Sequence, residues 1–213
     1  MTLLSKVVPP NLPVAQQDYT RLYQEQLNNA LRLYFTLLNG NVNNVIGTIG
    51  GRFLQFPYAA IQRTTDVSFT INTPTQITFD QSDYLSGCTN SGLDGIAVEY
   101  EGIYNYQFSV QLKNTDTQIH SAWIWLRKNG VDVAATGSKF DVISSHGGTP
   151  GFIIAACNFY VELAAGDTIE MWAAVDNVAV TFDATGASTS PFAMPAIPSV
   201  VATLSFVSTP PVA

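Results

Sequence analysis

After about Thr64 the sequence becomes a series of short apolar or alternating runs between turn residues, and no other part of the chain restricts the fold as strongly. About ten strands are predicted from these runs, at residues 67–71, 75–80, 96–100, 102–114, 121–128, 131–140, 151–163, 167–176, 178–184 and 198–207. No helical periodicity interrupts them, which excludes a parallel sheet built from alternating strands and helices. The sequence therefore predicts a mainly β fold, a ten-stranded jelly-roll sandwich with antiparallel sheets.

The run SAWIWLRKNG at residues 121–130 is unusual among these strands. Its closing Asn129-Gly130 is a type I′ hairpin signal, so the residues before it should alternate between two faces of a strand. Trp123 and Trp125 share one face. The opposite face is also apolar and consists of Ala122, Ile124 and Leu126. A lone sandwich buries only one face of each strand, so we predict that Trp123 and Trp125 lie in an interface between subunits.

The chain before this region has a different organisation. Three prolines near the start disfavour a helix, the run from Gln16 contains no proline or glycine until Gly40, and Gly50-Gly51 permits a change of direction. The predicted segments are an extended proline-rich arm (1–15), an anchoring or trimerising helix (16–40), a neck (41–66), the jelly-roll head (67–207) and a short tail (208–213).

The predicted helix carries a seam of apolar residues spaced alternately four and three apart. The seam consists of Tyr23, Leu27, Ala30, Tyr34 and Leu37. Such spacing keeps one line of side chains facing partner helices, so we predict association with copies of the same chain or with a larger scaffold. The alternative is a helix that lies on its own domain.

The net charge of −7 is divided unevenly along the chain. Residues 1–63 carry five basic and two acidic side chains, a net charge of +3, whereas residues 64–213 carry four basic and fourteen acidic ones, a net charge of −10. Nucleic-acid sites need clustered lysine and arginine, so nucleic acid is not an expected partner of the acidic head. The basic N-terminal segment is expected to dock on an acidic neighbour.

The start of the chain and its cysteines indicate synthesis in the cytoplasm. MTLLSKVVPPNLP has no continuous apolar core, so we predict no signal peptide, and no apolar run approaches the length of a membrane span. Cys88 and Cys157 are predicted to be free, partly buried thiols, with a disulfide between them as the alternative.

An ordered set of short motifs in the head resembles a known family. The set comprises GIYNYQFSVQL, WIWLRKNG, FYVELAAGDTIEMW and the closing PSVVATLSFV. Together they are similar to the tumour-necrosis-factor-like and complement-type globular head, over residues 67–207. The resemblance implies a ten-stranded jelly roll that assembles as a trimer around a threefold axis, with the tryptophan strand facing the axis or the neighbouring head.

The N-terminal segment NLPVAQQDYTRLYQEQLNNALRLYF resembles the leading segment of structural proteins in tailed bacteriophages of aquatic bacteria. This resemblance implies a protein located in the virion, with residues 1–40 bound to other virion proteins. We therefore predict a homotrimeric short tail fibre or fibre tip that contributes to host adhesion. The alternative is a trimeric capsid decoration or cement protein that stabilises the shell.

The sequence offers no constellation of residues for catalysis, so we predict that the protein is not an enzyme and needs no cofactor. His120 and His146 stand near turns, and a triad of Cys157, His120 and an acidic residue is disfavoured because Cys157 falls in an apolar strand. No D-x-D-x-D-G calcium loop is present, and we assign no metal ligand.

Loops are the expected recognition elements, because a jelly-roll trimer presents them at the end away from its anchor. The candidate loops span 82–95, 146–149 and 185–198. The predicted receptor-binding residues are Asp83, Asp94, His146, Thr149 and Phe192. For Phe192 the alternative is that it only packs the connection before the last strand.

Overall fold

The computed structural model describes residues 10–12, 14, 20–46, 56–90, 92 and 94–209. The chain divides into two compact units, Met1–Gln55 and Phe56–Ala213. Residues 1–9, 13 and 15 of the predicted arm and residues 47–55 of the predicted neck lie outside the described residues, so the structure does not test them.

In the described part of the first unit the structure has one helix, α1 (Arg21–Ile46). Thr20 caps its start, because the Tyr23 N–H donates to the Thr20 hydroxyl oxygen at 3.3 Å. The prediction that the helix would end at Asn39-Gly40 was wrong, since α1 continues six residues beyond Gly40. A glycine ends a helix when it takes a positive φ, and Gly40 is not among the residues with positive φ.

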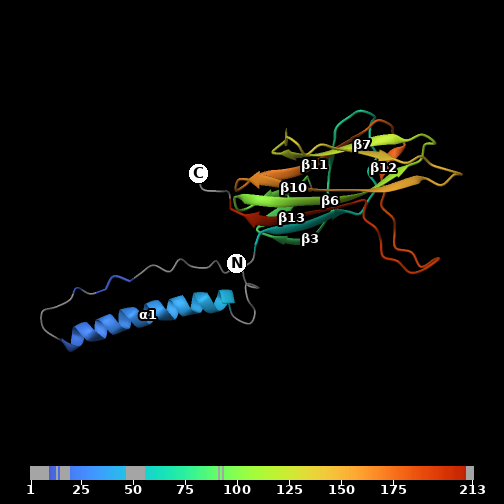
Figure 1. Cartoon of the computed structure of the whole chain (residues 1–213). Helices are drawn as coiled ribbons and strands as arrows, with labels where there is room; N and C mark the ends of the chain where they lie inside the picture. Colours follow the sequence, from blue (N-terminus) through green and yellow to red (C-terminus); the bar gives the residue numbers. More distant parts are fainter. Residues whose placement is uncertain are drawn as a thin grey trace. The chain divides into compact units, whose positions relative to one another are not determined.

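The second unit is a sandwich of two antiparallel sheets, which confirms the predicted mainly β class (Figure 1). Sheet A has the order β10 (Gly151–Leu163), β6 (Gly102–Asn114), β13 (Val200–Ser208), β1 (Tyr58–Arg63) and β3 (Gln81–Ser86), with β12 (Val180–Phe182) also paired to β6. Sheet B has the order β4 (Cys88–Asn90), β5 (Ile96–Val98), β11 (Thr168–Val175), β7 (His120–Lys128) and β8 (Val131–Asp132), with β2 (Thr75–Ile77) paired to β11 and β9 (Ser138–Val142) paired to β7.

Several strands differ from their predicted positions. Residues 58–63, assigned to the neck, form β1 between β13 and β3, so the sandwich begins before residue 67. Residues 67–71 form no strand, and Val67 makes only an isolated bridge to Phe182. The predicted strand at 131–140 is divided into β8 and β9, and the predicted loop at 82–95 contains β3 and β4. The structure describes thirteen strands rather than ten.

The core lies between the two sheets and is built by strict alternation along the long strands. In β6, Tyr104, Tyr106 and Leu112 are almost fully buried while the residues between them face outward. In β7, Ile124 and Leu126 have no exposed surface. The β7–β8 hairpin confirms the predicted turn: Asn129 and Gly130 have φ of 51° and 78°, and Lys128 pairs with Val131.

The sandwich has two ends that differ in their connections. β1 begins and β13 ends at one of them, which we call the β1 end. The opposite end, called the loop end, carries the connections 115–119, 143–150, 176–179 and 183–199. The last of these is drawn out into a ribbon that extends beyond the sheets (orange-red in Figure 1).

Candidate functional site

The outer face of sheet A carries large apolar side chains that are exposed on the sandwich. They are Tyr58, Tyr84, Phe152, Ile154 and Tyr160. Ile154 and Tyr160 are 65% and 67% exposed, and both project from the edge strand β10. This surface, with the outward residues of β6, β13 and β1 between its members, is called the sheet-A face.

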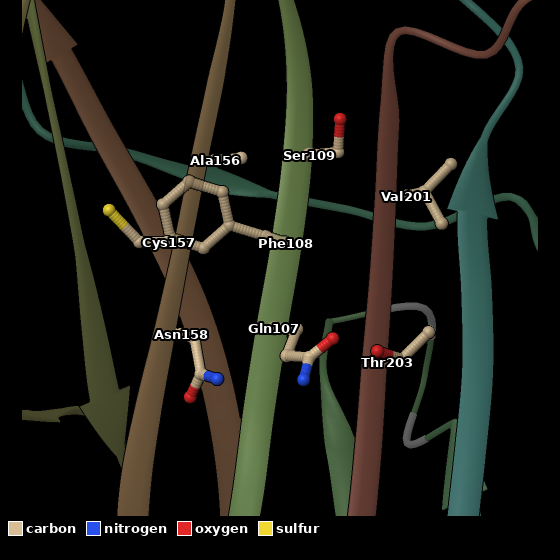
Figure 2. A pocket seen from close by; sticks show the side chains of 8 residues that line it. All are labelled: Gln107, Phe108, Ser109, Ala156, Cys157, Asn158, Val201 and Thr203. Carbon is tan, nitrogen blue, oxygen red and sulfur yellow. The ribbon is translucent and has the colours of Figure 1, made fainter.

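The centre of the sheet-A face is hollowed because its side chains are short. β10, β6 and β13 contribute to a hollow of about 600 Å³. Its lining residues are Gln107, Phe108, Ser109, Ala156, Cys157, Asn158, Val201 and Thr203 (Figure 2). The side chains of Gln107, Asn158, Ser109 and Thr203 therefore offer amides and hydroxyls for hydrogen bonds in the hollow. The large exposed apolar residues of the sheet-A face lie outside this hollow, further along the strands.

The sheet-A face has very few charges. Among the described residues of this face, the charged side chains at outward positions are Lys113 of β6 and Glu162 of β10, near opposite ends of their strands, and Asp83 of β3, which accepts from Gln62. Lys113 is paired with Asp183 at 2.7 Å. A broad surface with few charges and with exposed aromatic residues has the composition of a protein–protein contact rather than of a solvated sheet.

The tryptophans lie on the outer face of sheet B, where charged side chains of the same chain cover them. Trp125 lies directly across from Trp172, and the Arg127 guanidinium sits 3.8 Å from the centre of the Trp172 ring. The Trp125 ring N–H donates to Asp132 at 2.8 Å, and the Trp172 ring N–H donates to Glu170 at 2.9 Å.

Trp123 is the more exposed of the two predicted interface tryptophans, with 38% of its surface accessible. The Lys139 ammonium lies 5.8 Å from the centre of its ring. Charged side chains of the same chain therefore cover part of this face of β7, while Trp123 stays exposed. An interface through Trp123 and Trp125 remains a prediction. The sheet-A face is the better candidate.

The predicted helix seam coincides with the less exposed side of α1 along most of its length. Tyr23, Leu27, Ala30 and Tyr34 are partly buried, whereas Leu37 is 63% exposed and Leu38 takes its place in the stripe. The helix also exposes apolar side chains beside this stripe: Leu22, Leu33, Phe35 and Val42. α1 therefore presents an apolar surface wider than a two-position coiled-coil seam.

The predicted receptor-binding residues are not all in loops or at one end. Asp83 lies within β3, where it accepts hydrogen bonds from the side-chain amides of Gln62 and Gln81. Asp94 lies in the β4–β5 connection beside sheet B, and its carbonyl accepts from Gln76. His146, Thr149 and Phe192 do belong to connections of the loop end.

The two connections at the loop end differ in form. His146 and Thr149 close a tight turn through reciprocal backbone hydrogen bonds of 2.9 and 3.0 Å. Phe192, 65% exposed, stands at the tip of the 183–199 ribbon, which is held by backbone bonds between Thr185 and Ile197 and between Ser188 and Met194. Sequence reasoning located both connections but not the ribbon, because its pairing carries no strong periodicity.

The residues considered for catalysis are not brought together. His120 contacts Asp116 and Asp176, while the Cys157 thiol contacts the Ser138 hydroxyl at 3.4 Å. Both cysteines are free, as predicted. Burial raises the pKa of the Cys88 thiol to about 12, with a further contribution from Glu99, so Cys88 is not a nucleophile at neutral pH.

Among the described residues, no group of three or more histidine, cysteine or acidic side chains is placed to hold a metal ion. In the same part of the chain, no helix combines the length and the hydropathy needed to cross a membrane.

Hydrogen bonds hold the pKa of several aspartates below the ordinary value. The principal donors are His120 to Asp116, Arg127 to Asp132, Ser121 to Asp141 and Asn129 to Asp167. A carboxyl group whose pKa is lower in the folded state stabilises the fold above its unfolded pKa. That stabilisation disappears as the pH falls through the lower, folded value.

The free energy of unfolding is therefore expected to fall as the pH drops from about 5 to about 2. Chemical denaturation at a series of pH values measures this. Asp167→Asn should flatten the slope, because Asp167 accepts from both the Asn129 amide and the Ala164 N–H. An unfolding free energy that is equal at the two ends of this pH range contradicts the assignment.

No protein-family model matches the chain, and no curated protein matches it at a significant level.

Proposed function

We propose that this protein is a structural component of a phage virion, a homotrimeric short tail fibre or fibre tip that is anchored through its N-terminal segment and takes part in host adhesion. The observation that carries the proposal is the sheet-A face, which combines exposed aromatic and aliphatic residues with few charges. Such a surface is seldom left open on a protein that functions as a single subunit.

The interface between copies is placed on the sheet-A face. β10 supplies Phe152, Ile154 and Tyr160 at one edge of the sheet, and the hollow beside them can receive side chains of a neighbouring copy. An edge strand that presents both a free edge and an apolar face suits contact with another copy around a closed symmetry axis. The threefold order, and the jelly-roll arrangement of the two sheets, follow the sequence resemblance.

The anchor is assigned to the first unit of the chain. α1 displays apolar residues on more than one side and carries few charges, among them the Arg21–Glu25 pair at 2.7 Å. A helix with this composition is stable when it packs against other helices or a larger particle. The basic character of residues 1–63 supports docking on an acidic virion protein.

Adhesion is assigned to the loop end of the sandwich. The 183–199 ribbon contains one charged residue, Asp183 at its base, and exposes Phe192 at its tip. An exposed aromatic residue on a projecting, uncharged ribbon is suited to insertion into a surface of a partner. His146 and Thr149 lie in a connection at the same end.

Electron microscopy of particles with and without this protein tests the proposal against its alternative. Density that appears only on the tail supports the fibre. Density distributed over the capsid supports a decoration or cement protein and overturns the fibre. The location has to be measured because both functions use a trimer and an anchor. Absence of the protein from purified particles overturns both.

Removal of residues 1–55 is expected to abolish incorporation into particles while leaving the sandwich folded, because the two units are separately compact. Co-sedimentation with particles measures incorporation, and circular dichroism measures the β fold. The full-length chain added to the same particles is the control. Incorporation of the truncated chain at the full-length level contradicts the assignment of the anchor.

A further inference from the structure

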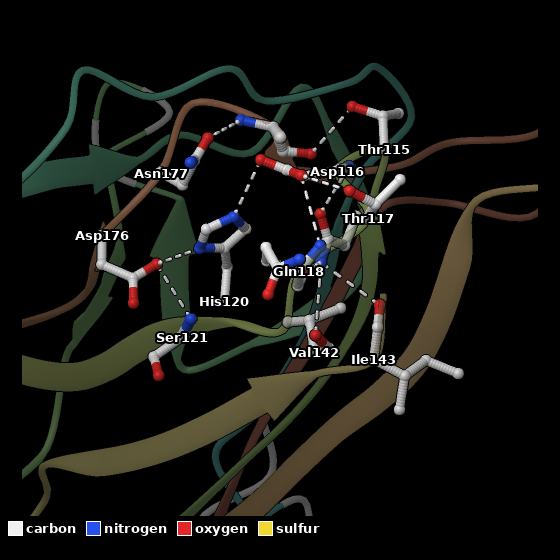
Figure 3. Close-up of polar contacts among 12 residues, drawn as sticks. Thr115, Asp116, Thr117, Gln118, His120, Ser121, Val142, Ile143, Asp176 and Asn177 are labelled. Atoms are coloured by element: carbon white, nitrogen blue, oxygen red, sulfur yellow. Dashed lines mark hydrogen bonds and ion pairs between the residues drawn. The ribbon is translucent and has the colours of Figure 1, made fainter. Parts of the chain in front are cut away.

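His120, the first residue of β7, lies between two carboxylates from different connections at the loop end (Figure 3). Its Nε2 is 3.1 Å from an Asp116 carboxylate oxygen, and its Nδ1 is 3.5 Å from an Asp176 carboxylate oxygen. Only 16% of the His120 side chain is exposed, compared with 36% for each aspartate. Both ring nitrogens therefore face an acceptor in a partly desolvated position.

The two aspartates also form hydrogen bonds with the backbone of other segments at the loop end. Asp176 accepts from the Ser121 N–H at 2.9 Å, and its own N–H donates to the Ser121 carbonyl at 3.2 Å. The Asp116 carbonyl accepts from the Ser145 N–H at 2.7 Å, directly before the His146–Thr149 turn. Through these contacts, His120 links the 115–119 connection with the 176–179 connection, and Asp116 extends the link to the 143–150 connection.

The protonation state of the imidazole decides whether both contacts are attractive. A neutral histidine has one N–H, so one ring nitrogen would direct its lone pair at a carboxylate. An imidazolium has two N–H groups and a positive charge, so it donates to Asp116 and also attracts Asp176 across the 3.5 Å contact. Histidine is the side chain that ordinarily changes charge between about pH 5 and pH 8.

The charged groups that face His120 are acidic. Asp116 and Asp176 face the ring, and Asp141 lies one hydrogen bond further away, where it accepts from the Ser121 hydroxyl at 2.7 Å. Lys139 is paired with Asp141 at 3.0 Å. Within the described parts of the chain, no lysine or arginine forms an ion pair with Asp116 or Asp176.

We propose that His120 is a proton-operated clamp on the loop end. When protonated it holds the 115–119 and 176–179 connections together, and when it loses its proton it releases one of the two aspartates and loosens both connections. The clamp lies outside the sheet-A face, so the inference holds whether or not the chain is a trimer or a virion protein. Its consequence is that acidity orders the end of the sandwich that carries the exposed connections.

Hydrogen exchange of the full chain at about pH 5.5 and pH 8, corrected for the intrinsic effect of pH on exchange, tests the clamp. Segments 114–121 and 175–180 are expected to exchange about fivefold faster at the higher pH, the effect of losing one charge-assisted hydrogen bond. Segment 103–111, in the centre of sheet A, should show no such change. Equal corrected exchange of the loop segments at both pH values overturns the proposal.

Two variants and a control identify the responsible group. His120→Gln keeps one donor but takes up no proton, and Asp176→Asn removes one carboxylate, so each should abolish the pH dependence of both loop segments. The chain contains two histidines, and His146→Gln, which leaves His120 in place, should behave as the unmodified chain does. Persistence of the pH dependence in His120→Gln, or its loss in His146→Gln, overturns the assignment to His120.

Discussion

Replacement of Ile154 by glutamate is expected to convert the full-length protein from the proposed trimer of about 69 kDa, three times 23.0 kDa, into a monomer of 23.0 kDa. Ile154 projects from β10 into solvent on the sheet-A face, at 65% exposure, so the change should not disturb the core of a single subunit. In an assembly the same position would be desolvated, and an unpaired carboxylate there is costly.

Light scattering at micromolar concentration measures the mass. Val131→Glu is the matched control, because Val131 is equally aliphatic, 70% exposed, and located on β8 of the other sheet. It should leave the mass at the trimer value. A trimer that survives Ile154→Glu, or one that dissociates only with Val131→Glu, would show that the sheet-A face is not the interface.

Ile124→Ala is expected to lower the free energy of unfolding by about 2–5 kcal/mol, the usual cost of removing a fully buried branched side chain. Ile124 has no exposed surface and points between the two sheets. Its neighbour Trp123 is larger but lies on the outer face of sheet B. Trp123→Ala should therefore cost less, about 1 kcal/mol, mainly through lost contact with Lys139.

Denaturant unfolding of both variants at one protein concentration gives the comparison. The order of the two losses is the informative result, because the substitutions are adjacent in β7 and differ in the face they affect. If Trp123→Ala proved more damaging than Ile124→Ala, the tryptophan face would be a packed interface, and the assignment of the subunit contact to the sheet-A face would be overturned.

The elements that sequence reasoning located well are those with long, regular patterns. Strands β6, β10 and β11 were predicted within one residue of their observed bounds, because alternation over many residues distinguishes a strand from a helix or loop. The β7–β8 turn was predicted correctly because only a few residue types tolerate two successive positive φ angles. These signals are local and need no partner.

The elements that sequence reasoning missed depend on distant partners. β1 is six residues long, and it becomes a strand because it pairs with β13 on one side and β3 on the other. α1 continues past Gly40 because this glycine does not take the positive φ that ends a helix. Composition does not show which φ a glycine takes. Of the candidate site residues, the structure leaves Asp83 within a strand and Asp94 beside sheet B, away from the loop end.

The alternation along the long strands was enough to predict antiparallel sheets, and the run without proline or glycine after Gln16 was enough to predict a helix ahead of them. The sequence did not determine which side of β7 would be buried, because Ile124 and the tryptophans alternate with equal regularity. The tertiary structure decided that question by packing the aliphatic side against sheet A and by bringing Arg127, Asp132 and Lys139 onto the tryptophans. The physical reason is that burial depends on which surfaces meet in space, and those meetings join residues far apart along the chain.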